Sequence, residues 1–136
     1  MLGKQVDTAW LFSEQAVPAG STPFHQANGY VFCDPVQMLT CWVALEDSDG
    51  LSVIPKLHRR GPMEHKWSSE SNSLTIPGLR KDDAIALPLR AGDVAVFWSV
   101  TPTSVGGGAG KAYSMQYAVD DWDALLWQPG ADERAP

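Results

Sequence analysis

The sequence predicts a single all-β domain. Apolar segments are short and rich in Val, Ile, Trp, Tyr and Phe, which is typical of strands. Pro or Gly recurs about every ten residues and leaves little room for long helices. Apolar content of 44% and charged content of 19% are those of an ordinary folded domain. We therefore expect residues 1–136 to form one domain, a β sandwich or barrel.

The expected strands are the apolar runs between turn residues. Segment 61–82 is polar and Ser-rich, and we expect a long loop there. A helical turn is expected over 120–127 and a frayed tail over 131–136. The strands are expected at 8–17, 22–25, 29–33, 38–45, 51–54, 84–89, 93–99 and 111–119.

Strand alternation gives two candidate inner faces for each strand, because successive side chains point to opposite sides. The sequence leaves open which face is inside. For strand 38–45 the alternatives are Met38, Thr40, Trp42 and Ala44, or Leu39, Cys41, Val43 and Leu45. For strand 111–119 they are Tyr113, Met115 and Tyr117, or Ala112, Ser114, Gln116 and Ala118.

Composition disfavours several classes of protein. The net charge is -6 and the basic residues are scattered, whereas nucleic-acid binding needs a concentrated basic surface. No apolar run approaches the roughly 20 residues of a membrane span, and the first residues contain no apolar signal core. Cys33 and Cys41 make a poor zinc pattern. We expect two reduced thiols in a cytoplasmic protein that binds neither nucleic acid nor membrane.

Several short motifs follow one another along the chain. They lie at 22–26 (TPFHQ), 28–30 (NGY), 32–35 (FCDP), 37–45 (QMLTCWVAL), 53–55 (VIP), 58–61 (HRRG), 89–94 (LRAGDV) and 113–118 (YSMQYA). In sequence and in order they resemble the phytanoyl-CoA dioxygenase family of Fe(II)/2-oxoglutarate oxygenases. The resemblance implies a double-stranded β-helix, a jelly roll of about eight strands, which the eight expected strands suit.

The resemblance also implies that the iron site has been lost. Such enzymes hold Fe(II) with two histidines and one carboxylate. Here His25 matches the first histidine, but Ala27 stands at the carboxylate position and Thr103 at that of the second histidine. Lys111 lies near the place of an arginine that pairs with 2-oxoglutarate, and lysine cannot replace its bidentate contact. We expect no metal and no cofactor.

The main functional hypothesis is a cofactor-independent enzyme on an oxygenase-like barrel. It would catalyse a non-redox cyclisation or isomerisation of an apolar small molecule, for instance in natural-product biosynthesis, mainly by holding the substrate in a reactive shape. The expected catalytic residues are His25, Tyr30 and Tyr113. The residues expected to contact the substrate are Ala27, Gln37, Thr40, Trp98, Thr103 and Gln116.

Two other functions remain open. One is a non-catalytic small-molecule-binding or regulatory pseudoenzyme, in which His25 is a relic, the tyrosines pack and Thr103 belongs to a turn. The other is a residual Fe(II)/2-oxoglutarate dioxygenase in which water or a substrate carboxylate supplies a missing ligand. A separate metal site at His58, Glu64 and His65 is disfavoured, since adjacent residues rarely point at one ion.

A homodimer is the expected assembly. The family usually carries a long helical part before the first motif, whereas few residues precede His25 in this sequence. One sheet face would then be bare and need a cover. We expect Trp10, Trp122 and Trp127 at the contact between two copies.

Overall fold

The computed structural model describes residues 9–17, 21–34, 38–106, 110–119 and 123–126. Its regular elements there are short strands and three 3-10 helices, so the prediction of an all-β chain is confirmed. The strands form two four-stranded sheets and two two-stranded ribbons. The 3-10 helices are η1 (Ala27–Gly29), η2 (Leu57–Arg60) and η3 (Lys81–Asp83).

The larger sheet has the strand order β1-β11-β4-β9, and neighbouring strands run antiparallel. A register shift interrupts the β1–β11 pair between Leu11 and Ser13. β9 pairs with β4 alone and is therefore an edge strand. The bounds are β1 (Ala9–Val17), β4 (Met38–Ala44), β9 (Val94–Trp98) and β11 (Ala112–Val119).

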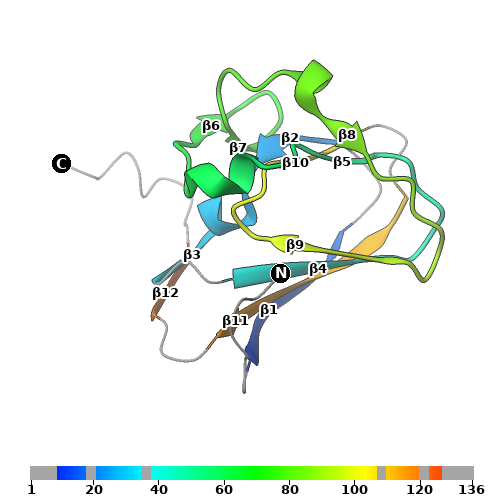
Figure 1. Ribbon diagram of the computed structural model, residues 1–136, viewed down its shortest axis with the longest axis horizontal. Helices are drawn as coiled ribbons and strands as arrows, with labels where there is room; N and C mark the ends of the chain where they lie inside the picture. The colour runs from blue at the N-terminus through cyan, green and yellow to red at the C-terminus, as the bar shows by residue number, and fades with distance from the viewer. Residues whose placement is uncertain (1–8, 18–20, 35–37, 107–109, 120–122, 127–136) are drawn as a thin grey trace.

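The smaller sheet has the order β2-β10-β5-β8 and lies over the larger one as a second layer (Figure 1). Consecutive strands of the two main sheets alternate between the layers, except for β5 and β8, which are neighbours in the smaller sheet. Two layers with inward-facing side chains are a standard way for antiparallel sheets to bury their apolar faces. The bounds are β2 (Thr22–His25), β5 (Leu51–Val53), β8 (Ile85–Ala86) and β10 (Thr103–Val105).

The structure decides which face of the larger sheet is inside. Met38 and Thr40 of β4 are almost fully buried, whereas Leu45, of opposite parity just after the strand, is 52% exposed. In β11, Ser114 and Gln116 are buried. The inner side chains are therefore Met38, Thr40, Trp42 and Ala44 of β4 with Ala112, Ser114, Gln116 and Ala118 of β11.

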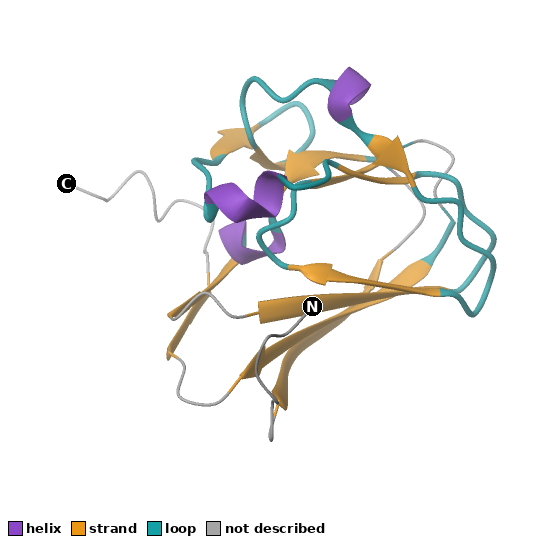
Figure 2. Ribbon diagram, viewed as in Figure 1, coloured by secondary structure: helices purple, strands orange, loops and turns teal. Residues whose placement is uncertain are grey.

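Segment 61–82 is not a structureless loop as expected. It contains a hairpin of β6 (Lys66–Ser68) and β7 (Ser73–Thr75), which lies beside the smaller sheet at the upper left of Figure 2. Asn72 takes the left-handed conformation in the hairpin turn, which asparagine tolerates better than most residues. The Ile76 N–H donates to the Phe24 carbonyl, and this bond attaches the hairpin to β2.

Three further expectations about local structure are wrong. Residues 123–126, expected in a helical turn, form β12 (Asp123–Leu126), which pairs with β3 (Val31–Asp34). The strand expected at 84–89 is reduced to β8, because Pro88 lacks an N–H and Leu89 forms only an isolated bridge with Ser48. Thr103 lies in strand β10 and not in a turn. The tail at 131–136 lies outside the described residues.

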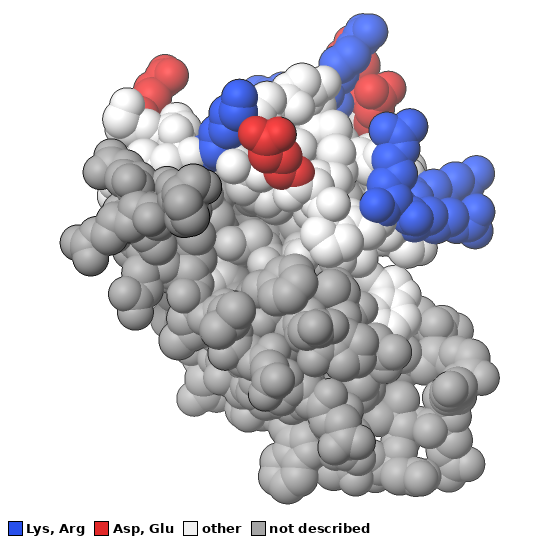
Figure 3. Space-filling model, turned by 90° about the vertical axis from the view of Figure 1, so that its left-hand side faces the viewer, with Lys and Arg blue, Asp and Glu red and all other residues white. Residues whose placement is uncertain are grey.

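Charge is mixed on the side of the molecule shown in Figure 3. The charged side chains described there lie in the upper part, the layer of the smaller sheet, where acidic and basic groups are neighbours. None of the described helices has the length and apolar character needed to cross a membrane.

Candidate functional site

His25 is the last residue of β2, and only one of its two ring nitrogens has a hydrogen-bond partner among the described residues. Its Nδ1 lies 2.9 Å from the Pro23 carbonyl oxygen. A carbonyl only accepts, so Nδ1 carries the hydrogen and Nε2 presents a lone pair. Burial lowers the pKa of His25, and the nearby His65 lowers it further, against the opposing effect of the Pro23 hydrogen bond. His25 is therefore neutral near pH 7.

The His25 ring lies deep in the protein but is not sealed. Protein surrounds the ring on nearly all sides, yet the residue keeps an intermediate solvent exposure. Thr103 is the direct partner of His25 across the β2–β10 pair, and paired residues share a face of the sheet. The two side chains therefore face the interior between the sheets.

The opposite sheet contributes hydroxyl and amide groups to this interior. The hydroxyls of Thr40 on β4 and Ser99 are 2.8 Å apart. On β11, the Gln116 side-chain amide donates to the Ser114 hydroxyl at 3.0 Å. All four residues are buried. The structure thus brings Thr40 and Gln116 to the same interior as His25 and Thr103, as the functional hypothesis requires.

Ala27 and Asn28 lie in η1, next to His25. Ala27 packs against the buried pair Met38 and Ala118, an apolar setting where a carboxylate would stand in the oxygenases. Asn28 is only 4% exposed, and its Oδ1 has no hydrogen-bond partner among the described residues. A buried acceptor without a donor is costly, so Asn28 marks a place for a donor from a bound molecule or water. Asn28 is not among the site residues expected from the sequence.

Gln26 holds the site together, and sequence reasoning missed it. Its side chain is fully buried. The side-chain amide nitrogen donates to the carbonyls of Gly61 and Val100, at 3.0 and 2.6 Å. The side-chain oxygen accepts the Met63 N–H at 2.8 Å. These partners lie 35 to 74 residues away along the chain, so no local sequence pattern could have indicated them.

His65 is a structural residue and not a metal ligand. Its Nε2 accepts the Gln26 N–H, and its Nδ1 donates to the Met63 carbonyl, both at 2.9 Å. The ring packs so tightly on Gly29 that an added Cβ there would lie 2.7 Å from Nε2. Glu64 is exposed. Among the described residues, no cluster of His, Cys, Asp or Glu is arranged to hold a metal ion.

Tyr30 touches His25 but directs its hydroxyl elsewhere. The two rings meet edge to face, with centroids 5.5 Å apart. The Tyr30 oxygen accepts the Leu74 N–H at 2.8 Å, which attaches β7 to the end of η1. Burial raises the pKa of Tyr30. Its position supports orientation of the His25 ring more directly than proton transfer to a substrate.

Two other expected site residues do not join this group. Tyr113 lies on β11 opposite in parity to Gln116, so it faces away from the interior. Trp98 pairs with Leu39, whose parity is opposite to that of Thr40, so it also lies on the outer face. Their placement differs from the expectation because strand parity alone leaves the inner face undecided. Gln37 lies outside the described residues.

The side chains at the expected iron and cosubstrate positions do not fit those groups. Of the three ligand positions only His25 can bind Fe(II), since Ala27 has no donor and Thr103 offers a neutral hydroxyl. Lys111 is 65% exposed and lies 3.8 Å from Glu46, with which it pairs. Lys111 therefore belongs to the surface and not to a cosubstrate pocket.

Comparison with known proteins agrees with the motifs. A family model described as Phytanoyl-CoA dioxygenase matches residues 3–102. A phytanoyl-CoA dioxygenase of Arabidopsis thaliana is 25% identical over 97 residues, which cover 65% of this chain and 34% of that protein. The chain thus spans only about a third of this curated relative.

Two solved structures share the fold. The apo form of the non-heme monooxygenase ThoJ has a TM-score of 0.70 at 20% identity, over 87% of this chain and 52% of ThoJ. EvdO2 from Micromonospora carbonacea var. aurantiaca, complexed with 2-oxoglutarate, has a TM-score of 0.68 at 21% identity, over 89% and 56% of the two chains. The chain spans about half of either protein, and at these identities the likeness concerns the fold alone.

The first prediction concerns pH. The pKa values of His25 and His65 are both lowered in the folded state, mainly by burial. Below the unfolded value of about 6.5, the unfolded chain then binds more protons, so stability falls as pH decreases. We expect the thermal midpoint to decrease between about pH 7.5 and 5.5. The double variant His25→Asn/His65→Gln should flatten this slope, and an unchanged slope would contradict it.

The second prediction concerns the lost ligands. Because Thr103 pairs directly with His25, Thr103→His combined with Ala27→Asp restores two histidines and a carboxylate around one point. We expect the double variant to bind Co(II), with visible absorption and a higher thermal midpoint when the ion is added. The control is Ala27→Asp with Ser104→His, which places the histidine on the opposite face of β10. A folded double variant that binds no Co(II) would show that the loops no longer hold the ligand geometry.

Proposed function

Since the chain belongs to the phytanoyl-CoA dioxygenase family but lacks two of the three iron ligands, we propose that it is a metal- and 2-oxoglutarate-independent enzyme on the oxygenase scaffold. The proposed scaffold is the double-stranded β-helix, a jelly roll whose eight main strands form the two sheets. The proposed reaction is a non-redox isomerisation or cyclisation of a small molecule. The proposal is carried by the His25 Nε2, which has no hydrogen-bond partner among the described residues although His25 keeps an intermediate solvent exposure.

The proposed chemistry needs only groups of this chain. The neutral His25 Nε2 removes a proton from an acidic C–H or O–H of the substrate, and the resulting imidazolium returns it at another atom. The proton count is unchanged, and no electron acceptor is needed. The Thr103 hydroxyl, opposite His25, would donate to the oxygen on which negative charge develops. Tyr30 supports the imidazole ring from the side.

The proposed substrate is mostly apolar with one or two polar groups. Ala27, two residues after His25, packs against the buried apolar pair Met38 and Ala118. The Asn28 Oδ1 and the His25 Nε2 both accept hydrogen bonds, so they suit a substrate with a hydroxyl or N–H donor. Sites of this kind commonly combine an apolar lining with a few polar groups that fix orientation.

The third prediction tests whether His25 can be reached. Diethyl pyrocarbonate acylates unprotonated imidazole nitrogens that solvent can reach. We expect it to modify His25 at pH 7, because Nε2 has no hydrogen-bond partner among the described residues and His25 keeps an intermediate solvent exposure. His65 is the internal control and should be protected, because both its nitrogens are hydrogen bonded. Peptide mass spectrometry after brief treatment measures both sites.

If His25 stays unmodified in this experiment while the protein remains folded, the interior is closed to small molecules. The enzyme proposal would then fail. The alternative of a non-catalytic regulatory pseudoenzyme would take its place, with His25 as a packed relic.

We also propose a homodimer through the outer face of the larger sheet. Three rows of uncharged side chains cross this face, as the strand register defines them. Val94 and Val96 on edge strand β9 are 52% and 43% exposed. Glu14 of β1 continues the Met115 row, so the uncharged part of the face is limited to β11, β4 and β9. In a chain with net charge -6, such an uncharged patch is where two copies repel least. The rows are Tyr113–Val43–Val94, Met115–Cys41–Val96 and Tyr117–Leu39–Trp98.

The three rows alone are too small for a stable contact between two copies, so the interface must extend beyond them. Three strands spaced by about 4.8 Å and about 20 Å long give roughly 300 Å² per copy. A standard interface needs about 800 Å² per partner. Trp10, which was expected at the contact, lies on β1 and pairs with Ala118 of the inner set, so the register does not place it in these outer rows. Trp122 and Trp127, also expected at the contact, lie outside the described residues.

The fourth prediction tests this interface. We expect light scattering at tens of micromolar to give the mass of a dimer, and Val94→Lys/Val96→Lys to convert it to a monomer. The matched control is Ile85→Lys, because Ile85 is 54% exposed but lies on β8 of the other sheet. A monomer mass for the unmodified protein would contradict the proposal, as would a dimer that tolerates both lysines.

A further inference from the structure

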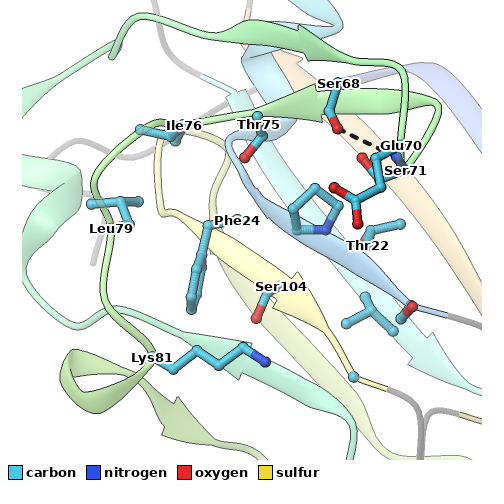
Figure 4. Close-up of a pocket in the computed structure, with 14 residues that line it drawn as sticks. Thr22, Phe24, Ser68, Glu70, Ser71, Thr75, Ile76, Leu79, Lys81 and Ser104 are labelled. Carbon is cyan, nitrogen blue, oxygen red and sulfur yellow. Dashed lines mark hydrogen bonds between the residues drawn. The ribbon is translucent and has the colours of Figure 1, made fainter.

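A pocket lies on the outer side of the smaller sheet, away from His25 (Figure 4). Its volume is about 870 Å³. Strands β2 and β10 contribute Phe24 and Ser104 to it, and the β6–β7 hairpin with the segment after it forms the far wall. Phe24 and Ser104 are the neighbours of His25 and Thr103 along their strands, so they point to the opposite side of the sheet. The pocket is therefore separate from the proposed catalytic interior.

Apolar side chains lie at the base of this pocket. Phe24 and Ile76 are both almost fully buried, and Leu79 is partly buried beside them. In Figure 4 the Phe24 ring lies in the middle of the pocket, between Leu79 and Ser104. The base therefore offers an aromatic ring and two aliphatic side chains to the apolar part of a ligand.

Hydroxyl groups surround this apolar base. Ser68 accepts the Ser71 N–H at 3.3 Å, and Ser71 accepts the Ser73 hydroxyl at 2.8 Å, so both serines keep their own hydrogen for donation. The Thr22 Oγ1 is buried and has no hydrogen-bond partner among the described residues. Thr75 and Ser104 add two more hydroxyls to the lining. The wall can thus both donate and accept hydrogen bonds at several points.

The charges of the pocket cancel. Glu70 projects from the hairpin turn, and Lys81 lies on the other side of the pocket (Figure 4). Both residues are exposed. A carboxylate at one edge disfavours a phosphate or another polyanion, and the single ammonium disfavours a polycation. The numerous hydroxyls disfavour a wholly apolar ligand, because they would lose their water on binding without new partners.

We propose that this pocket binds a neutral polyhydroxylated ligand, a sugar unit or a disaccharide. A sugar ring has C–H faces that suit Phe24, Ile76 and Leu79, and its hydroxyls both donate and accept as the serines and threonines do. The pocket volume falls within the range of about 300–1,000 Å³ usual for small-molecule sites. The inference does not depend on the proposed enzyme activity, because the pocket uses the other face of β2 and β10.

The experiment follows backbone amide signals of the labelled protein by NMR during addition of maltose, lactose or myo-inositol. At least one of these probes should shift the amides of Ser68, Thr75 and Ser104 at concentrations up to about 50 mM, where weak neutral ligands bind. Thr75→Val replaces one hydroxyl by a methyl group of similar size, and Ser104→Ala removes another. Each should raise the dissociation constant about tenfold, the usual value of one neutral hydrogen bond.

Thr103→Val is the matched control, because it removes the neighbouring hydroxyl on the opposite face of β10 and should leave the binding of the probes unchanged. Unchanged thermal midpoints show that the three variants remain folded. The proposal is wrong if no probe shifts these amides, or if the shifts centre on His25 and Thr103. Inorganic phosphate shifting the same amides in place of the sugars would identify an anion site and overturn it too. Modification of His25 by diethyl pyrocarbonate reports on the catalytic proposal independently.

Discussion

The buried Gln26 side chain is the constraint on which the site geometry depends. It joins the end of β2 to the segments around Gly61 and Val100 through hydrogen bonds with backbone groups. Each such bond contributes about 1 kcal/mol net, and leaving its buried partner unpaired costs about 1–3 kcal/mol. Because the amide nitrogen faces two carbonyls and the oxygen faces an N–H, only one orientation of the amide satisfies all three.

This constraint explains how an iron-site loop can keep its shape without iron ligands. Metal binding normally contributes to the stability of the segments that hold the ligands. Here Gln26 lies directly between His25 and Ala27, and its own N–H is bonded to His65. The His65 ring then fills the space next to Gly29, and Tyr30 receives the Leu74 N–H. Hydrogen bonds and packing thus fix the loop in place of a metal.

The sequence was sufficient for the parts of the fold that local patterns determine. Strands such as β2 and β11 follow from short apolar runs between turn residues. The β6–β7 hairpin could not be found in this way, because its strands have three residues each and only Leu74 is deeply buried. Its place depends on the Tyr30 hydroxyl and the Phe24 carbonyl, which are distant in sequence.

The sequence could name several residues of the candidate site, but it could not give their arrangement in space. The family motifs identified His25, Ala27 and Thr103, and β2–β10 pairing explains why His25 and Thr103 meet. Strand alternation alone could not show that Gln116 faces the interior and Tyr113 faces away from it, since a shift by one residue exchanges the two faces. Asn28 was missed for a different reason. Its significance lies in an unpaired buried oxygen, which only three-dimensional packing reveals.

Strands β2 and β10 serve two sites with alternate residues, and Pro23 belongs to both. Its carbonyl accepts the hydrogen of the His25 Nδ1 and so fixes which nitrogen faces the interior. Pro23 also lines the outer pocket. A molecule in the outer pocket would therefore contact the residue whose carbonyl orients the His25 ring.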